Sequence, residues 1–149
     1  MRVLKISAFV LVCILFFSTV SHAGFISEIT EAAFQKAVLE SDEPVIVWFN
    51  SGSTYGKLAD DIDRFVQKKS PVKVLKMDKN FNSLTAGKYK IKRNNTFVFF
   101  ADGVDIERTT SIKSIEDFEE FVKHCLVEYY KALEDERQNE WKPSVKKEK

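Results

Sequence analysis

The chain has 149 residues, of which 44% are hydrophobic, and it carries 23 Lys and Arg against 22 Asp and Glu. This length suits one domain with a proper hydrophobic core but not two. The basic residues are scattered and almost balanced by acidic ones, so we expect no nucleic-acid partner.

The first 23 residues have the pattern of a secretory signal peptide. Arg2 and Lys5 give a basic start, an apolar run covers Ala8 to Phe17, and Ser21–Ala23 supplies the small residues that signal peptidase reads. The alternative, a membrane anchor, needs roughly 20 apolar residues, about twice this run. We therefore expect cleavage before Gly24, export to a periplasm or to a secretory lumen and the extracellular space, and no membrane span afterwards.

The exported chain would contain few reactive side chains. Removing 23 of the 149 residues leaves 126, with Cys125 as the only Cys and His124 as the only His. A single Cys cannot form an internal disulfide, so the core alone must stabilise the domain. One Cys, one His and scattered carboxylates also lack the spacing of a metal site, and we expect neither a metal nor a cofactor.

Strand and helix patterns alternate from Ile26 onward. Thr30 and Ser114 stand where helix caps are expected, and Asp102-Gly103 is a hairpin turn signal. In chain order we expect a short strand at Ile26–Thr30, a helix at Glu31–Glu40, a strand at Val45–Phe49, a helix at Lys57–Lys69, a strand at Val72–Asp78, a weak helix within Asn82–Ile91, a strand from Thr96, its antiparallel partner at Val104–Thr110, and a long helix after Ser114. They should share one core: Phe34, Val45, Val47, Phe49, Leu58, Ile62, Phe65, Val74, Phe97, Phe99, Phe118 and Val122.

Several of these segments resemble thioredoxin sequences. "ITEAAFQKAVLESDEPVIVWF" (Ile29–Phe49) is similar to the opening of a thioredoxin, with a capped helix, a Ser-Asp-x-Pro turn and the central strand. "VKVLKMD" (Val72–Asp78) looks like the third strand with its terminal Asp, "KYKI" (Lys88–Ile91) resembles the step that follows, and "TFVFFADGVDIER" (Thr96–Arg108) is similar to the closing hairpin. The resemblance covers about Ile26 to Val122. It implies an α/β thioredoxin fold: a central mixed sheet with helices on both faces, here with an extended C-terminal helix.

The same resemblance shows what is missing. Thioredoxins carry Trp-Cys-x-x-Cys after the central strand, because attack on a disulfide needs a low-pKa thiolate and a second thiol. The matching stretch here is "SGSTYGK" (Ser51–Lys57), one residue shorter, with Ser53 and Gly56 nearest the two cysteine positions. Trp48 stands where the family keeps a buried carboxylate, and Asn95 stands where it has a cis-proline. Three parts of one mechanism are absent together, which predicts a thioredoxin-like domain without redox chemistry.

Another chemistry in the same loop is not favoured. Ser53, Thr54 and Tyr55 precede a helix, whose N-terminus can attract an anion, but they are more simply interpreted as helix caps and turn residues. A Ser hydroxyl with no base beside it cannot replace a thiolate, and a Ser-His-Asp arrangement would need His124 from the last helix.

The C-terminal helix continues its apolar face through Tyr129, Tyr130 and Leu133, beyond the usual end of a thioredoxin, and a polar tail with Trp141 and Pro143 follows. Two interpretations remain open: a solvated helix end with a frayed tail, or a docking segment, since Tyr and Trp are favoured interface anchors. The chain thus divides into a signal peptide (1–23), a thioredoxin-like domain (24–126), and a helix extension with a polar tail (127–149).

Two functions follow from this pattern. The favoured one is a non-catalytic module that binds an unidentified protein or peptide, because main-chain pairing in the family's groove does not depend on thiols. Its expected surface is Ser53, Thr54, Tyr55 and Gly56 with Asn94 and Asn95, and a non-proline cis bond costs about 2.5–4 kcal/mol, so Asn95 should be trans. The alternative is an atypical thiol-disulfide protein acting through Cys125. Cys125 lies on the apolar face of its helix, where burial would raise its pKa.

Overall fold

The computed structural model describes residues 26–52, 56–68 and 70–140. The predicted signal peptide, the loop residues Ser53, Thr54 and Tyr55, and the tail residues Trp141 and Pro143 lie outside these ranges.

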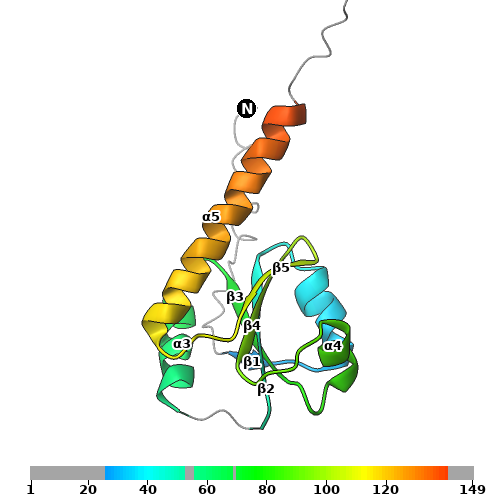
Figure 1. The fold of residues 1–149 in the computed structure, drawn as a ribbon, viewed down its shortest axis with the longest axis vertical. Helices are drawn as coiled ribbons and strands as arrows, with labels where there is room; N and C mark the ends of the chain where they lie inside the picture. The colour runs from blue at the N-terminus through cyan, green and yellow to red at the C-terminus, as the bar shows by residue number, and fades with distance from the viewer. Residues whose placement is uncertain (1–25, 53–55, 69, 141–149) are drawn as a thin grey trace, which may run out of the picture.

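Five strands form one mixed sheet in the order β1-β3-β2-β4-β5 (Figure 1). β1, β3 and β2 are parallel, β4 is antiparallel to β2, and β5 is antiparallel to β4. The strands are β1 (Ser27–Glu28), β2 (Val45–Asn50), β3 (Lys73–Asp78), β4 (Thr96–Ala101) and β5 (Val104–Thr109). All six residues of β2 and of β4 are buried, as expected of apolar runs at the centre of a sheet covered on both faces.

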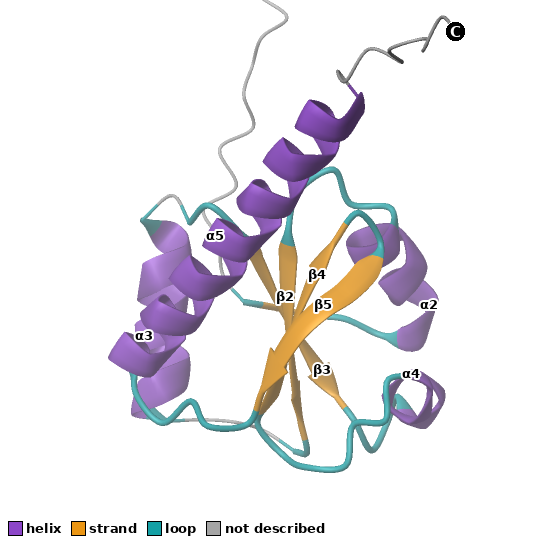
Figure 2. Ribbon diagram, turned by 45° about the horizontal axis from the view of Figure 1, so that its top comes forward, coloured by secondary structure: helices purple, strands orange, loops and turns teal. Residues whose placement is uncertain are grey.

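Helices cover both faces of this sheet (Figure 2). On one face lie α2 (Glu31–Phe34), which continues as a π-helical segment η1 (Gln35–Leu39), and the short α4 (Ser83–Lys88); on the other lie α3 (Lys57–Gln67) and α5 (Ile115–Glu140). The element order, the mixed sheet and the long last helix confirm the predicted α/β thioredoxin fold.

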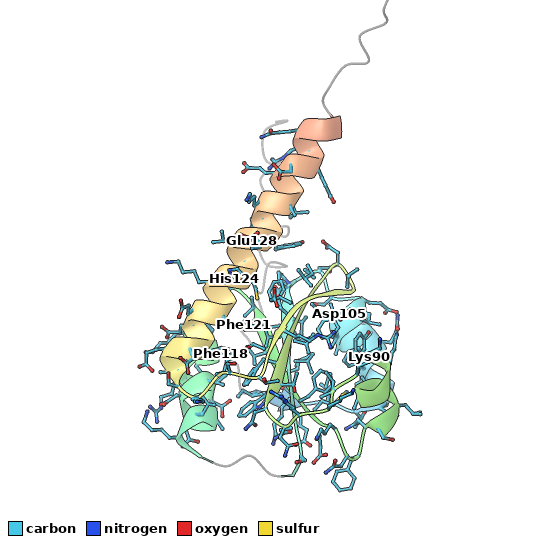
Figure 3. All side chains as sticks on the ribbon, in the orientation of Figure 1. Lys90, Asp105, Phe118, Phe121, His124 and Glu128 are labelled. Carbon is cyan, nitrogen blue, oxygen red and sulfur yellow. The ribbon has the colours of Figure 1, made fainter. Side chains whose placement is uncertain are left out.

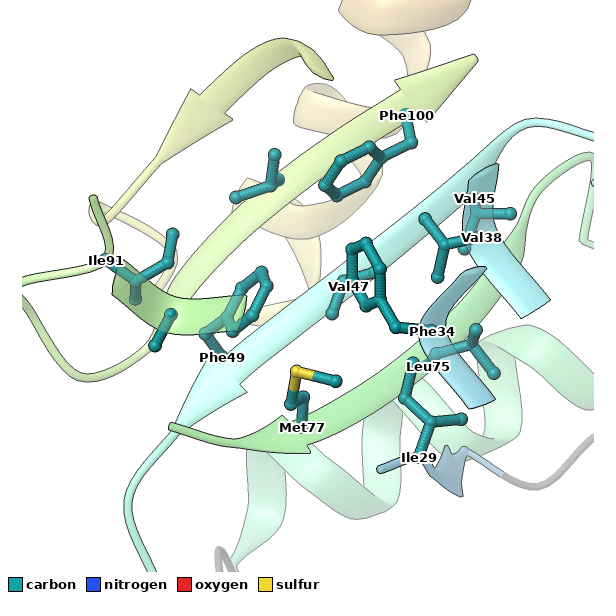
Figure 4. Close-up of a cluster of buried hydrophobic side chains, with 12 residues drawn as sticks. Ile29, Phe34, Val38, Val45, Val47, Phe49, Leu75, Met77, Ile91 and Phe100 are labelled. Carbon is teal, nitrogen blue, oxygen red and sulfur yellow. The ribbon is translucent and has the colours of Figure 1, made fainter. Parts of the chain in front are cut away.

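The predicted single core is wrong in one respect, because the sheet divides it into two clusters. The cluster under α2 and α4 contains Phe34, Val45, Val47 and Phe49 (Figure 4). The cluster under α3 and α5 contains the remaining buried members of the prediction, which are Ile62, Val74, Phe97, Phe99, Phe118 and Val122. Leu58 and Phe65 are only half-buried at its margin. Alternate residues of one strand point to opposite faces, so β2 and β4 each supply both clusters.

One of the two predicted helix caps is confirmed and the other is wrong. The Ser114 hydroxyl accepts the Asp117 N–H (3.3 Å), and the Asp117 carboxylate accepts the Ser114 N–H (3.1 Å), which forms a reciprocal capping box. The Thr30 side chain makes no capping hydrogen bond. Instead the side-chain oxygen of Asn82, from the segment before α4, accepts the N–H of Glu31 (2.8 Å), so a distant residue takes the place of the local cap.

The last helix runs without a break from Ile115 to Glu140. It crosses the sheet and then extends beyond it (Figure 1), and residues 131–138 are all exposed. No helix of the described ranges combines the length and the apolar character needed to cross a bilayer.

Candidate functional site

Three connections meet at one edge of the sheet. β2 and β3 end there side by side, since Asn50 is paired with Asp78. β4 begins at the same edge, since Thr96 is paired with Phe49. The loop from β2 to α3, the turn after β3 and the segment before β4 are therefore neighbours. Gly56 ends the first of these connections, and Asn94 and Asn95 lie in the third.

The carboxylate of Asp78 holds two of these connections together. One of its oxygens accepts the N–H of Gly52 (2.7 Å), from the loop after β2, and the other accepts those of Asn80 (2.8 Å) and Phe81 (3.3 Å), from the turn after β3. Burial of the side chain acts to raise the pKa of Asp78. The hydrogen bonds from the backbone of Asn80, Gly52 and Phe81 stabilise the charged form more, and the pKa lies below its ordinary value. Asp78 therefore anchors the loop as a carboxylate at neutral pH.

Trp48 and Asn95 form the third link. The Trp48 side chain is fully buried under α3 and α5 and stacks on Phe97, with ring centroids 5.1 Å apart. Its indole N–H donates to the side-chain oxygen of Asn95 (3.2 Å), so the polar end of a large buried ring is satisfied. The two residues that the sequence resemblance matched to the family's buried acid and cis-proline are thus joined by a hydrogen bond.

The backbone at Asn95 confirms that its peptide bond is trans. No cis peptide bond occurs in the described ranges, and Asn95 is trans as predicted. Its φ of 54° is left-handed, a conformation that Asn tolerates better than most residues. Asn95 is exposed, and its side-chain oxygen accepts the Trp48 indole N–H. Asn94 is also exposed and takes no part in this hydrogen bond.

The predicted loop residues are only partly described. Gly56 is exposed and directly precedes α3 as its N-cap, and its carbonyl accepts the Asp60 N–H (3.2 Å). Since Gly56 has no side chain, α3 starts without a side-chain cap at that position. The predictions for Ser53, Thr54 and Tyr55 lie outside the described residues.

Phe81 and Leu84 were missed as candidate site residues. Phe81 is 87% exposed and Leu84 is 78% exposed, and both follow β3, next to the connection that Asp78 ties to Gly52. These two large apolar side chains are therefore open to solvent close to the candidate site. The signal was present as Phe81, a large apolar residue outside the periodic pattern of a helix or strand.

The thiol lies elsewhere. Cys125 is 1% exposed and belongs to the cluster between α5 and the sheet. Burial, with a smaller effect from the Glu107 carboxylate, raises the pKa of its thiol to about 12. His124 is exposed on α5 (Figure 3), a helix that runs away from the edge where the three connections meet. Among the described residues, no three His, Cys, Asp or Glu side chains lie close enough together to hold a metal ion.

Comparison with known sequences identifies the family. The sequence profile described as Thioredoxin matches residues 25–124. The chain belongs to the thioredoxin family. It is 34% identical over 83 residues to thioredoxins of Rickettsia typhi and Rickettsia prowazekii, an alignment that covers 52% of this chain and 77% of each relative. It is 34% identical over 82 residues to a thioredoxin of Rickettsia conorii, covering 52% and 76% of the two chains. The predicted family is confirmed.

Proposed function

We propose that this thioredoxin-family protein is exported and binds a protein or an extended peptide without catalysing thiol-disulfide exchange. The observation that carries the proposal is the contact between Trp48 and Asn95. An indole held by an amide occupies the positions that resemble the family's buried acid and cis-proline, and neither group can move a proton as a carboxylate does.

The cysteine content supports the same proposal. The connection between β2 and α3 contains no Cys anywhere in its sequence, and the buried Cys125 has its pKa raised to about 12. Because only a thiolate attacks a disulfide, a pKa five units above neutrality leaves on the order of one thiol in 100,000 ionised at pH 7. This disfavours the alternative thiol-disulfide function, although the named relatives are thioredoxins.

The proposed contact surface is the edge where the three connections meet. The predicted residues are Ser53, Thr54, Tyr55 and Gly56 together with Asn94 and Asn95, and the exposed Phe81 extends the same surface. The Asp78 hydrogen bonds to Gly52 and Phe81 hold two of its parts in a fixed relation, which lowers the entropy lost on binding. Main-chain pairing with a peptide remains available there without thiols.

The first experiment addresses chemistry. The purified protein should not reduce insulin disulfides with dithiothreitol or with a thioredoxin reductase as electron donor, and Cys125→Ser should behave like the wild type. Turnover above background that disappears in the Ser variant would refute the non-catalytic assignment.

The second experiment addresses binding. Proteins captured from the compartment in which the chain accumulates would be identified, and their affinity measured for the wild type, for Tyr55→Ala with Asn94→Ala, and for Phe81→Ser. Both variants should bind at least about tenfold more weakly, as expected when interface anchors are lost. Truncation after Leu133 should leave the affinity unchanged. The reverse result would assign binding to the C-terminal segment instead.

A further inference from the structure

One face of α5 carries a seam that the domain leaves uncovered. Six exposed residues of this helix follow one another at alternating intervals of three and four, the spacing of a coiled-coil seam; they are Glu120, Lys123, Val127, Tyr130, Glu134 and Arg137. The residues of α5 that contact the sheet, among them Phe118, Val122 and Cys125, lie on another face. At 100° per residue, the centres of the two faces are about 140° apart around the helix axis. The seam therefore lies on the side of α5 that faces away from the sheet.

The middle of the seam is apolar and borders a groove. Val127 is 55% exposed and Tyr130 is 56% exposed, and Leu133, on the flank of the seam, is 36% exposed. Val127 and Tyr130 line a groove of about 780 Å³ together with the half-buried Leu126 and with Phe65 from α3. Apolar side chains gathered on one open helix face mark an interaction site. Tyr129 still touches the domain, since its hydroxyl donates to Asp102 (2.9 Å), but residues 131–138 are all exposed as the helix extends beyond the domain (Figure 3). A partner helix can therefore lie along the seam.

The seam complements itself when a second copy runs antiparallel. With the two-fold axis between Glu128 and Tyr129, each Val127 faces Tyr130 of the second copy. Lys123 then faces Glu134 of the second copy, and Glu120 faces its Arg137. Two-fold symmetry repeats every contact, so an apolar centre is flanked on both sides by two layers of opposite charges. The overlap from Glu120 to Arg137 is about 26 Å at 1.5 Å per residue.

The charges reject the parallel arrangement. In register, a parallel pair would place Lys123 against Lys123, Glu134 against Glu134, and likewise for Glu120 and Arg137, giving four layers of like charge. In the described ranges Glu120 and Lys123 have no ion-pair partner, and Arg137 approaches Glu134 only at 4.0 Å. These charges are therefore available to a second chain.

We infer that the chain forms a two-fold symmetric dimer through antiparallel pairing of α5, with Val127 and Tyr130 at its centre. Leu126 and Leu133, seven residues apart on one flank of the seam, meet across the axis and widen the apolar centre. Cys125 faces the sheet, so the dimer needs no disulfide and persists in reducing agent.

The arrangement is tested by measuring the dimer dissociation constant with sedimentation equilibrium. The protein is used in the form that the cell accumulates, and mass spectrometry establishes its N-terminus. Lys123→Glu should weaken the dimer about fivefold or more, because it creates two contacts between like charges. Adding Glu134→Lys in the same chain should restore the dimer. Glu128→Lys is the matched control: it makes a charge change of the same size on α5 outside the seam, and should leave the affinity within about twofold. Val127→Asp with Tyr130→Asp should leave only monomer.

All the substituted side chains are exposed, so we expect each variant to remain folded. Circular dichroism checks this. A wild type that stays monomeric up to its limit of solubility would overturn the inference. So would a dimer that Lys123→Glu leaves intact, or one that the paired exchange fails to restore, because either result excludes this antiparallel contact. A seam covered by a different protein would give the first of these outcomes.

Discussion

Replacing Asp78 with Asn tests whether one carboxylate holds the candidate site together. The Asn side chain would have nearly the same shape as Asp. One carboxylate oxygen, however, would become an NH₂ group, and a backbone N–H that donates to this oxygen in the wild type would then face another donor. The wild type receives three such N–H groups, from Gly52, Asn80 and Phe81, on a side chain that is 4% exposed. Losing a hydrogen bond to a charged group should cost about 1.5–3 kcal/mol of the free energy of unfolding at pH 7.

The pH dependence gives this prediction a second readout. The pKa of Asp78 is lower in the folded protein than its ordinary value of 3.8, so its contribution is fully present above pH 3.8 and is lost as the pH falls through the folded-state pKa. The difference between wild type and Asp78→Asn should therefore be constant from pH 7 to about pH 5 and shrink below pH 4.

Urea unfolding followed by circular dichroism at several pH values measures both effects. Asp42→Asn removes a carboxylate from an exposed turn and serves as the control, with an expected cost within about 0.5 kcal/mol. A cost for Asp78→Asn below about 1 kcal/mol, or a difference that is the same at pH 7 and pH 3, would refute the assignment of Asp78 as the buried acceptor of these amides.

Three further predictions concern a buried ring, a tight turn and the Trp48–Asn95 hydrogen bond. Phe99→Ala should cost about 3–5 kcal/mol in urea unfolding because the ring is fully buried; a cost below about 1 kcal/mol would contradict its central position. Gly103→Ala should destabilise more than Gly52→Ala: both have positive φ, but only at Gly103 would a Cβ lie 2.8 Å from a backbone atom, the Leu39 carbonyl oxygen. Equal losses would show that the contact relaxes. Asn95→Gly should cost about 1–3 kcal/mol by depriving the buried indole N–H of its acceptor, and Asn95→Ala about 1 kcal/mol more for the left-handed backbone; indole fluorescence reports the first effect.

The sequence predicted the elements well because their signals are local. β2 and β4 are unbroken apolar runs, and α3 repeats apolar residues on one face, so strand and helix periods identify them directly. The limits of the helix at Lys57 are less well predicted: it ends at Gln67 rather than Lys69, since frayed helix ends carry little sequence signal.

What the sequence could not predict depends on residues far apart in the chain. Thr30 has the residue type of a good local cap. In the structure, however, the Glu31 N–H donates to the side-chain oxygen of Asn82, 51 residues away in the sequence. The division of the core into two clusters likewise depends on which residues of each strand point to each face, and a run that is apolar at every position does not reveal this. Asp78 was identified only as the end of a strand, because its backbone partners come from two different connections.

The substitutions at Trp48 and Asn95 have a different meaning in the structure from the one they have in the sequence. In the sequence they are two separate losses, of a carboxylate and of a proline. In the structure they are one replacement, because an indole too large and too polar to be buried alone needs an acceptor, and Asn95 provides it. The Asn95 backbone is left-handed and its side-chain oxygen accepts the indole N–H. A proline could provide neither feature, since it has no side-chain acceptor and no access to positive φ. Two positions that resemble catalytic ones in a thioredoxin are thus joined into a structural contact, and restoring either residue alone would leave the other without its partner.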